Sequence, residues 1–134
     1  MLTRARLAAY QLESPVTADA IAAAEQAAPI PFPAAYKNLL SISNGLYSDG
    51  CLALHPIEAL MQRNHDYEVH TYLPDYYMIG DDSGGQAILI DRHGIIYEVG
   101  MGVMDAAYLE KSADTLDALL IDHAGKTLNE RTND

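Results

Sequence analysis

The chain has 134 residues, of which 49% are hydrophobic and 20% charged, and this composition predicts one globular domain over residues 1–134. A net charge of −11 repels phosphate backbones and anionic lipid headgroups, so we expect neither a nucleic acid nor a membrane as a direct partner. Cys51 is the only cysteine, which excludes an internal disulfide and a cluster of thiolate metal ligands.

The first half of the sequence has the apolar spacing of helices, with prolines between them. Thr17 can cap a helix with its hydroxyl, and Asn44 and Gly45 can end a later one, because a left-handed residue commonly closes a helix. Residues 64–74 carry no clear period and are interpreted as a loop or an irregular strand. The predicted helices cover residues 1–11, 17–28, 33–43 and 57–61, and a short strand at 51–54 precedes the last of them.

From Tyr76 onward, runs of β-branched and aromatic residues between glycine-containing turns predict an antiparallel meander. Gly94 is expected in a left-handed position of a hairpin turn. Ser112 is placed to cap a closing helix that Gly125 ends, which gives an α+β fold with a sheet flanked by helices. The predicted strands cover residues 76–79, 86–91 and 95–99, with a weaker one at 107–110.

The run Asp82–Ser83–Gly84–Gly85 resembles the nucleophile segment of chymotrypsin-like serine proteases. Such enzymes need a longer chain and a histidine and an aspartate that activate the hydroxyl, and the five histidines do not match that family's histidine motif. The run is therefore interpreted as a tight turn between strands, and we expect no enzymatic activity. A small hydrolase that uses Ser83 or a His/Asp site remains a remote alternative.

Candidate metal ligands occur in two places, but neither has the spacing of a known site. His65 and His70 are five residues apart and would point to different sides of a helix or strand. Asp81 and Asp82 lack the alternating ligands of a calcium loop. A glycine loop that binds the phosphates of a nucleotide precedes a helix, whereas the glycines near Asp82 lie between two strands. We therefore expect no metal and no cofactor.

The acidic residues are concentrated in the second half of the chain. Residues 1–67 hold four basic and six acidic residues (net −2), whereas residues 68–134 hold four basic and thirteen acidic ones (net −9). Nine tyrosines, one phenylalanine and no tryptophan make the aromatic set largely amphipathic. Tyr67, Tyr72, Tyr76 and Tyr77 cluster just before the acidic loop. Tyrosine beside acidic groups is typical of a surface that recognises a protein, here a basic one, and the alternative is that individual tyrosines belong to the core.

Several segments, taken in order, form one pattern: Ile30–Pro31 with Tyr36–Lys37, Asn44–Gly45, the Gly80-to-Gly85 loop before a strand that ends in Asp91, and the closing helix. This pattern resembles the SUKH superfamily, the Smi/Knr-like group of fungal cell-wall-synthesis regulators and bacterial toxin-immunity proteins. The resemblance covers about residues 17–121.

The resemblance implies a non-catalytic interaction module, in bacteria commonly an immunity protein that neutralises a polymorphic toxin, often a nuclease, from a neighbouring gene. A regulatory scaffold like the fungal members is the alternative.

The chain has no long apolar run, and no such stretch follows Arg4 and Arg6, so we expect a cytoplasmic location. The predicted partner-binding residues are Asp81, Asp82, Asp91, Glu98, Asp105 and Tyr76.

Overall fold

The computed structural model describes residues 1–132, and within them seven antiparallel strands form one sheet in the order β1-β2-β3-β4-β5-β6-β7. Every strand pairs with its neighbours in sequence, so the predicted meander is confirmed and extends further toward the N-terminus than expected. The strands are β1 (Gln11–Leu12), β2 (Leu46–Tyr47), β3 (Ala53–Leu54), β4 (Tyr76–Asp81), β5 (Gln86–Asp91), β6 (Ile96–Gly100) and β7 (Glu110–Ala113).

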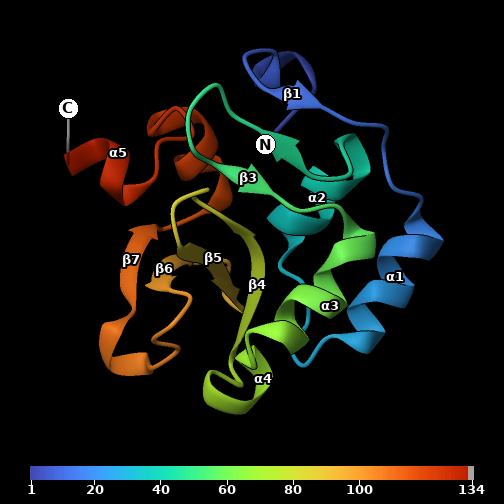
Figure 1. Ribbon diagram of the computed structural model, residues 1–134. Helices are drawn as coiled ribbons and strands as arrows, with labels where there is room; N and C mark the ends of the chain where they lie inside the picture. The colour runs from blue at the N-terminus through green and yellow to red at the C-terminus, as the bar shows by residue number, and fades with distance from the viewer. Residues whose placement is uncertain (133–134) are drawn as a thin grey trace.

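The antiparallel sheet together with its helices confirms the α+β class; most helices lie between consecutive strands, η1 precedes β1, and η3 and α5 follow β7. Two helices connect β1 to β2, two connect β3 to β4, and α1 and α3 lie beside each other on one side of the molecule (Figure 1). The helical elements are η1 (Ala5–Leu7), α1 (Ala18–Ala27), α2 (Ala34–Ile42), α3 (Ile57–Asp66), α4 (Val69–Tyr72), η2 (Ala106–Tyr108), η3 (Ala118–Asp122, a π-helix) and α5 (Leu128–Thr132).

Local signals placed several boundaries correctly. The Thr17 hydroxyl accepts a hydrogen bond from the Ala20 amide at 3.2 Å and caps α1 as predicted. Gly45 and Gly94 both adopt positive φ angles, +81° and +86°, after α2 and in the β5–β6 turn. These are the positions where the sequence predicted a left-handed residue.

Four predictions were wrong, because tertiary contacts determined the outcome. Residues 1–11 form one short 3-10 turn and the start of β1, and residues 64–74 contain helix, since α3 runs on to Asp66 and α4 follows. The strand expected at 107–110 is displaced, because η2 occupies Ala106–Tyr108 and β7 begins at Glu110. Ser112 does not cap a helix. It is buried in β7, where its hydroxyl donates a 2.8 Å hydrogen bond to Glu98 on the neighbouring strand.

Both faces of the sheet are covered. The central strands carry apolar side chains on each face, so each face needs a covering layer. On one face Tyr77, Ile79 and Ile88 join the main core with α1, α2, α3 and η3. On the other face a smaller cluster is covered by α4 and by the connection between β6 and β7. The second cluster consists of Val69, Leu73, Met78, Ala87, Leu89, Val99 and Met104.

Candidate protein-binding site

The turn between β4 and β5 is held by its two aspartates. One Asp82 carboxylate oxygen accepts hydrogen bonds from the Gly84 and Gln86 amides at 2.8 and 2.9 Å. Asp81 accepts a bond from the Ser83 amide at 2.9 Å. Because Asp82 is only 3% exposed, its charge is used inside the turn and offers little surface to a partner.

Ser83 and His55 both lie near Asp81, but they do not form a catalytic set. The Ser83 hydroxyl donates to the backbone carbonyl of Cys51 at 2.9 Å, so its proton is not directed at a histidine. His55 Nε2 lies 3.0 Å from the Asp81 carboxylate, and the ring is buried. Burial lowers the pKa of His55, although the charge of Asp81 acts in the opposite direction.

Glu98 lies inside the molecule. One of its oxygens accepts hydrogen bonds from the Ser112 hydroxyl and from the Leu128 amide at 2.9 Å, at the start of α5. The other oxygen is buried without a hydrogen-bond partner. Burial raises the pKa of Glu98, while the hydrogen bonds from Ser112 and Leu128 oppose that effect. Glu98 is only 2% exposed. Its bond to the Leu128 amide positions the C-terminal segment.

Asp91 and Tyr76 face each other in register on β5 and β4 and are both half-buried. The Asp91 carboxylate accepts bonds from the His93 and Ile95 amides at 2.9 and 3.1 Å, and so closes the β5–β6 turn. The Tyr76 ring packs edge-on against Tyr97 with centroids 5.3 Å apart. Part of each side chain remains open to solvent.

Asp105, the sixth predicted residue, is exposed and lies beside a groove of about 510 Å³. The groove separates the α3–α4 junction from the β6–β7 connection. In Figure 1, α4 lies at the lower edge of the view, with the orange turn before β7 to its left. Three large apolar side chains line the groove and are unusually exposed: Tyr72 (57%), Val103 (49%) and Tyr108 (61%).

The rim of this groove is acidic. Asp66, Glu68 and Asp105 line it, and no lysine, arginine or histidine among the described residues does so. Glu68 has a φ angle of +54°, a left-handed conformation that non-glycine residues rarely adopt. The chain turns from α3 into α4 at this residue. We call this surface the acidic aromatic groove; it is formed by Asp66, Tyr67, Glu68, Tyr72, residues 101–105 and Tyr108.

Sequence reasoning found only part of the groove. Tyr67, Tyr72 and Asp105 were recognised as tyrosine or acid in a protein-binding pattern, but Val103 and Tyr108 were not. These two follow the Gly100–Gly102 break, and their distance of more than thirty residues from Tyr72 hides their proximity. The available signal in the sequence was the run of apolar residues around Gly102, namely Met101, Val103 and Met104.

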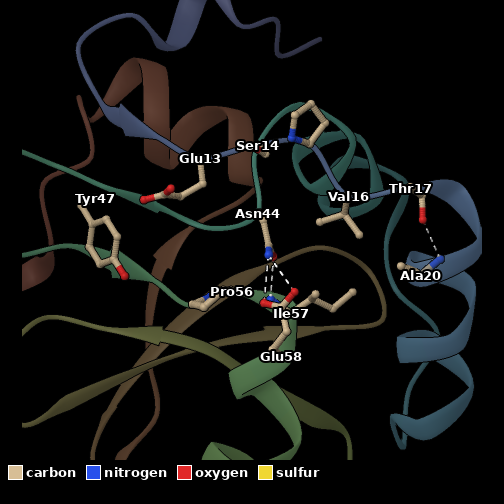
Figure 2. Close-up of a pocket in the computed structure, with 11 residues that line it drawn as sticks. Glu13, Ser14, Val16, Thr17, Ala20, Asn44, Tyr47, Pro56, Ile57 and Glu58 are labelled. Carbon is tan, nitrogen blue, oxygen red and sulfur yellow. Dashed lines mark hydrogen bonds between the residues drawn. The ribbon is translucent and has the colours of Figure 1, made fainter.

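A second groove of about 520 Å³ lies between β2 and the starts of α1 and α3 (Figure 2). The Asn44 side chain points into the start of α3, where its carbonyl oxygen accepts a 2.7 Å bond from the Ile57 amide. Its amide nitrogen donates to both oxygens of Glu58, at 3.0 and 2.9 Å. Asn44 therefore caps α3 from a distant segment, which is a structural role.

Neither a metal cluster nor a membrane span occurs in the described part of the chain. Within residues 1–132 no three histidine, cysteine, aspartate or glutamate side chains are grouped as ligands for a metal ion. The helices of that same range are all too short or too polar to cross a bilayer.

The order of elements agrees with the comparison against protein families. No curated protein sequence matches the chain. The model of the SMI1 / KNR4 family (SUKH-1) matches residues 15–122, close to the 17–121 expected from the motifs, and includes Asn44 and the β4–β5 turn. Since this match covers well over half of the 134 residues, the chain belongs to the SMI1 / KNR4 family (SUKH-1).

Proposed function

We propose that this chain is a non-catalytic protein-binding module of the cytoplasm, and that it acts as an immunity protein by capturing and neutralising a basic toxin. Family membership supports the proposal, because SUKH members include toxin-immunity proteins and regulators. The observation that carries it is the acidic aromatic groove, in which exposed Tyr72, Val103 and Tyr108 adjoin three carboxylates. Exposed aromatic side chains of this kind are enriched at protein interfaces.

The predicted binding residues divide into two groups by their surroundings. Asp105 is exposed, and Asp91 and Tyr76 are partly so, which leaves them available to a partner. Asp82 and Glu98 are almost fully buried, and Asp81 is paired with His55, so we assign these three to the internal order of the fold. Charge reversal at Asp82 would therefore disturb the β4–β5 turn and is a poor test of binding.

The charge of the groove explains how capture of a basic protein would occur. Long-range attraction between an acidic surface and a basic partner accelerates association, and this acceleration falls as salt screens the charges. Blocking the active site of a nuclease, or its approach to nucleic acid, would then follow from occupying a basic surface that otherwise binds phosphate.

The test begins with a pull-down from native extract on the immobilised full chain, in about 0.05 M and about 0.5 M salt, at which screening differs strongly. The retained protein is then expressed alone and together with this chain. We expect a basic protein that binds more weakly at high salt, arrests growth when expressed alone and is neutralised by co-expression. A retained cellular protein without toxicity would favour the regulatory scaffold, and an acidic one would refute the electrostatic basis.

A further inference from the structure

The acidic aromatic groove is built by two segments that come together only in the fold. The end of α3 and α4 supply Tyr67 and Tyr72, and the β6–β7 connection supplies Val103 and Tyr108. Both segments bury apolar residues against the second face of the sheet, where Val69 and Met104 join one cluster. The groove therefore rests on a packed base, while its own apolar walls stay open.

The exposure of these walls is exceptional for this protein. Among the described residues, six large hydrophobic side chains are exposed, and three of them line this single groove. The other three, Met1, Tyr47 and Met61, do not line it. A contiguous exposed apolar patch with a polar rim marks an interaction surface in a soluble protein, whereas scattered apolar residues do not.

The rim determines what kind of occupant fits. Asp66, Glu68 and Asp105 provide negative charge on both sides of the apolar walls, and no basic side chain of the described residues lines the groove. A second copy of this chain would bring the same carboxylates face to face and would add its own charge of −11. Charge repulsion thus opposes self-association through this surface and favours a cationic partner.

We propose that the groove receives one large apolar side chain of a partner protein, seated between Tyr72 and Tyr108, with lysine or arginine residues on both sides of it. The flanking cations pair with Asp66 or Glu68 on one bank and with Asp105 on the other. This assignment rests on the proposed function and specifies its contact: an apolar anchor supplies affinity, and the charged rim orients it.

The direct test uses a synthetic peptide as the probe and the full chain labelled with ¹⁵N. The peptide carries Leu-Trp between two pairs of lysines. One control replaces the lysines with glutamates, and another replaces Leu-Trp with two glycines. We expect the lysine peptide to shift the amide resonances of residues 66–72 and 101–108, and each control peptide to bind at least about fivefold more weakly.

Variants separate an anchor site from general attraction to an acidic protein. Tyr108→Ser removes an exposed wall of the groove, and Asp105→Asn removes one rim charge, although Asp105 also caps η2. Met61→Ser is the matched control, since Met61 is 64% exposed on α3 but does not line the groove. We expect Tyr108→Ser to weaken peptide binding at least about fivefold, and Met61→Ser to leave it unchanged.

Several outcomes would overturn this inference. These are the absence of any shift with the lysine peptide, shifts centred on other residues, equal binding of the glutamate peptide, or concentration-dependent dimerisation through the groove without peptide. Its failure can be told apart from failure of the proposed function. If a toxin is neutralised equally well by the Tyr108→Ser variant, the function stands and the groove is wrong. If the peptide binds as expected but no toxin is neutralised, the groove stands and the function is wrong.

Discussion

The side-chain amide of Asn64 pairs with both backbone groups of Met78. Its oxygen accepts a 2.8 Å bond from the Met78 amide, and its nitrogen donates a 2.9 Å bond to the Met78 carbonyl. Met78 lies where the register of β4 shifts, and β3 pairs with β4 only at Gly80 and Asp81. Asn64 thus takes the place of a neighbouring strand and fixes α3 against the sheet.

Replacing Asn64 with alanine should lower the free energy of unfolding by about 3 kcal/mol. The change leaves a buried amide and a buried carbonyl of Met78 without partners, and each such loss costs about 1–3 kcal/mol. Urea unfolding measures the difference, and Gln62→Ala serves as the control because Gln62 is exposed on the same helix. Similar losses for the two variants would mean that the pairing with Met78 contributes nothing specific.

Gly45→Ala should destabilise the fold by about 2 kcal/mol or more, because a left-handed backbone and lack of space act together. Gly45 has a φ angle of +81°, and an added Cβ would lie 2.5 Å from the Leu54 carbonyl oxygen. Gly102→Ala is the control, since a Cβ there meets no atom within 4 Å. Thermal or urea unfolding of both variants measures this. An unchanged Gly45→Ala protein would contradict the close approach of α2's end to β3.

The stability of the protein should fall as the pH drops below about 6.5, with His55 as one cause. Burial lowers the pKa of His55 below its ordinary value of 6.5, so the unfolded chain takes up this proton at a higher pH than the folded one. The contribution is complete above 6.5 and is lost as the pH falls toward the lowered value. His55→Gln should flatten this part of the profile in urea unfolding, whereas His93→Gln, at an exposed position, should not.

Glu98 should produce a dependence of the opposite sign at lower pH. Its pKa is raised above the ordinary 4.5, chiefly by burial, so the folded protein binds this proton more tightly than the unfolded chain. Its ionisation penalises the folded state fully above the raised pKa and disappears as the pH falls to 4.5. The free energy of unfolding of the natural protein, relative to Glu98→Gln, should therefore rise on acidification. A constant difference, equal to that for the exposed Glu110→Gln, would contradict this.

Asp105→Lys and Asp82→Lys should differ in kind. Asp105 is exposed, and its lysine variant should stay folded but slow the association of a basic partner, with a weaker effect at high salt. Asp82 is buried and accepts two bonds within the β4–β5 turn, so its lysine variant should lose stability by about 3 kcal/mol. Stopped-flow association and urea unfolding measure the two effects. Equal stability of the two variants would show that the turn tolerates the loss of its carboxylate.

Much of the fold could be predicted because its signals are local. The Thr17 cap, the Gly94 turn and the apolar runs of the central strands depend on residues a few positions apart. Helix α4 and the extension of α3 could not be predicted in this way. Asn64 is a weak helix former, and its place in α3 depends on bonds to Met78, fourteen residues later.

The six predicted binding residues show the same division. Acidic sequence composition marks Asp82 and Asp105 alike, yet one is 3% exposed and closes a turn while the other is exposed beside a groove. Composition gives the number of charged residues, but it does not show which carboxylates accept hydrogen bonds from backbone amides. Only the arrangement of the chain in space separates these two uses.

The sequence by itself determined the α+β class, the antiparallel order of the central strands and the acidic character. These follow from the period of apolar residues, from turn chemistry and from a sum of charges, none of which needs a long-range contact. The tertiary structure alone decided that Tyr72 and Tyr108 share one groove and that Glu98 lies inside. Such proximity arises when distant segments pack on the same face of a sheet, and it leaves no periodic trace in the sequence.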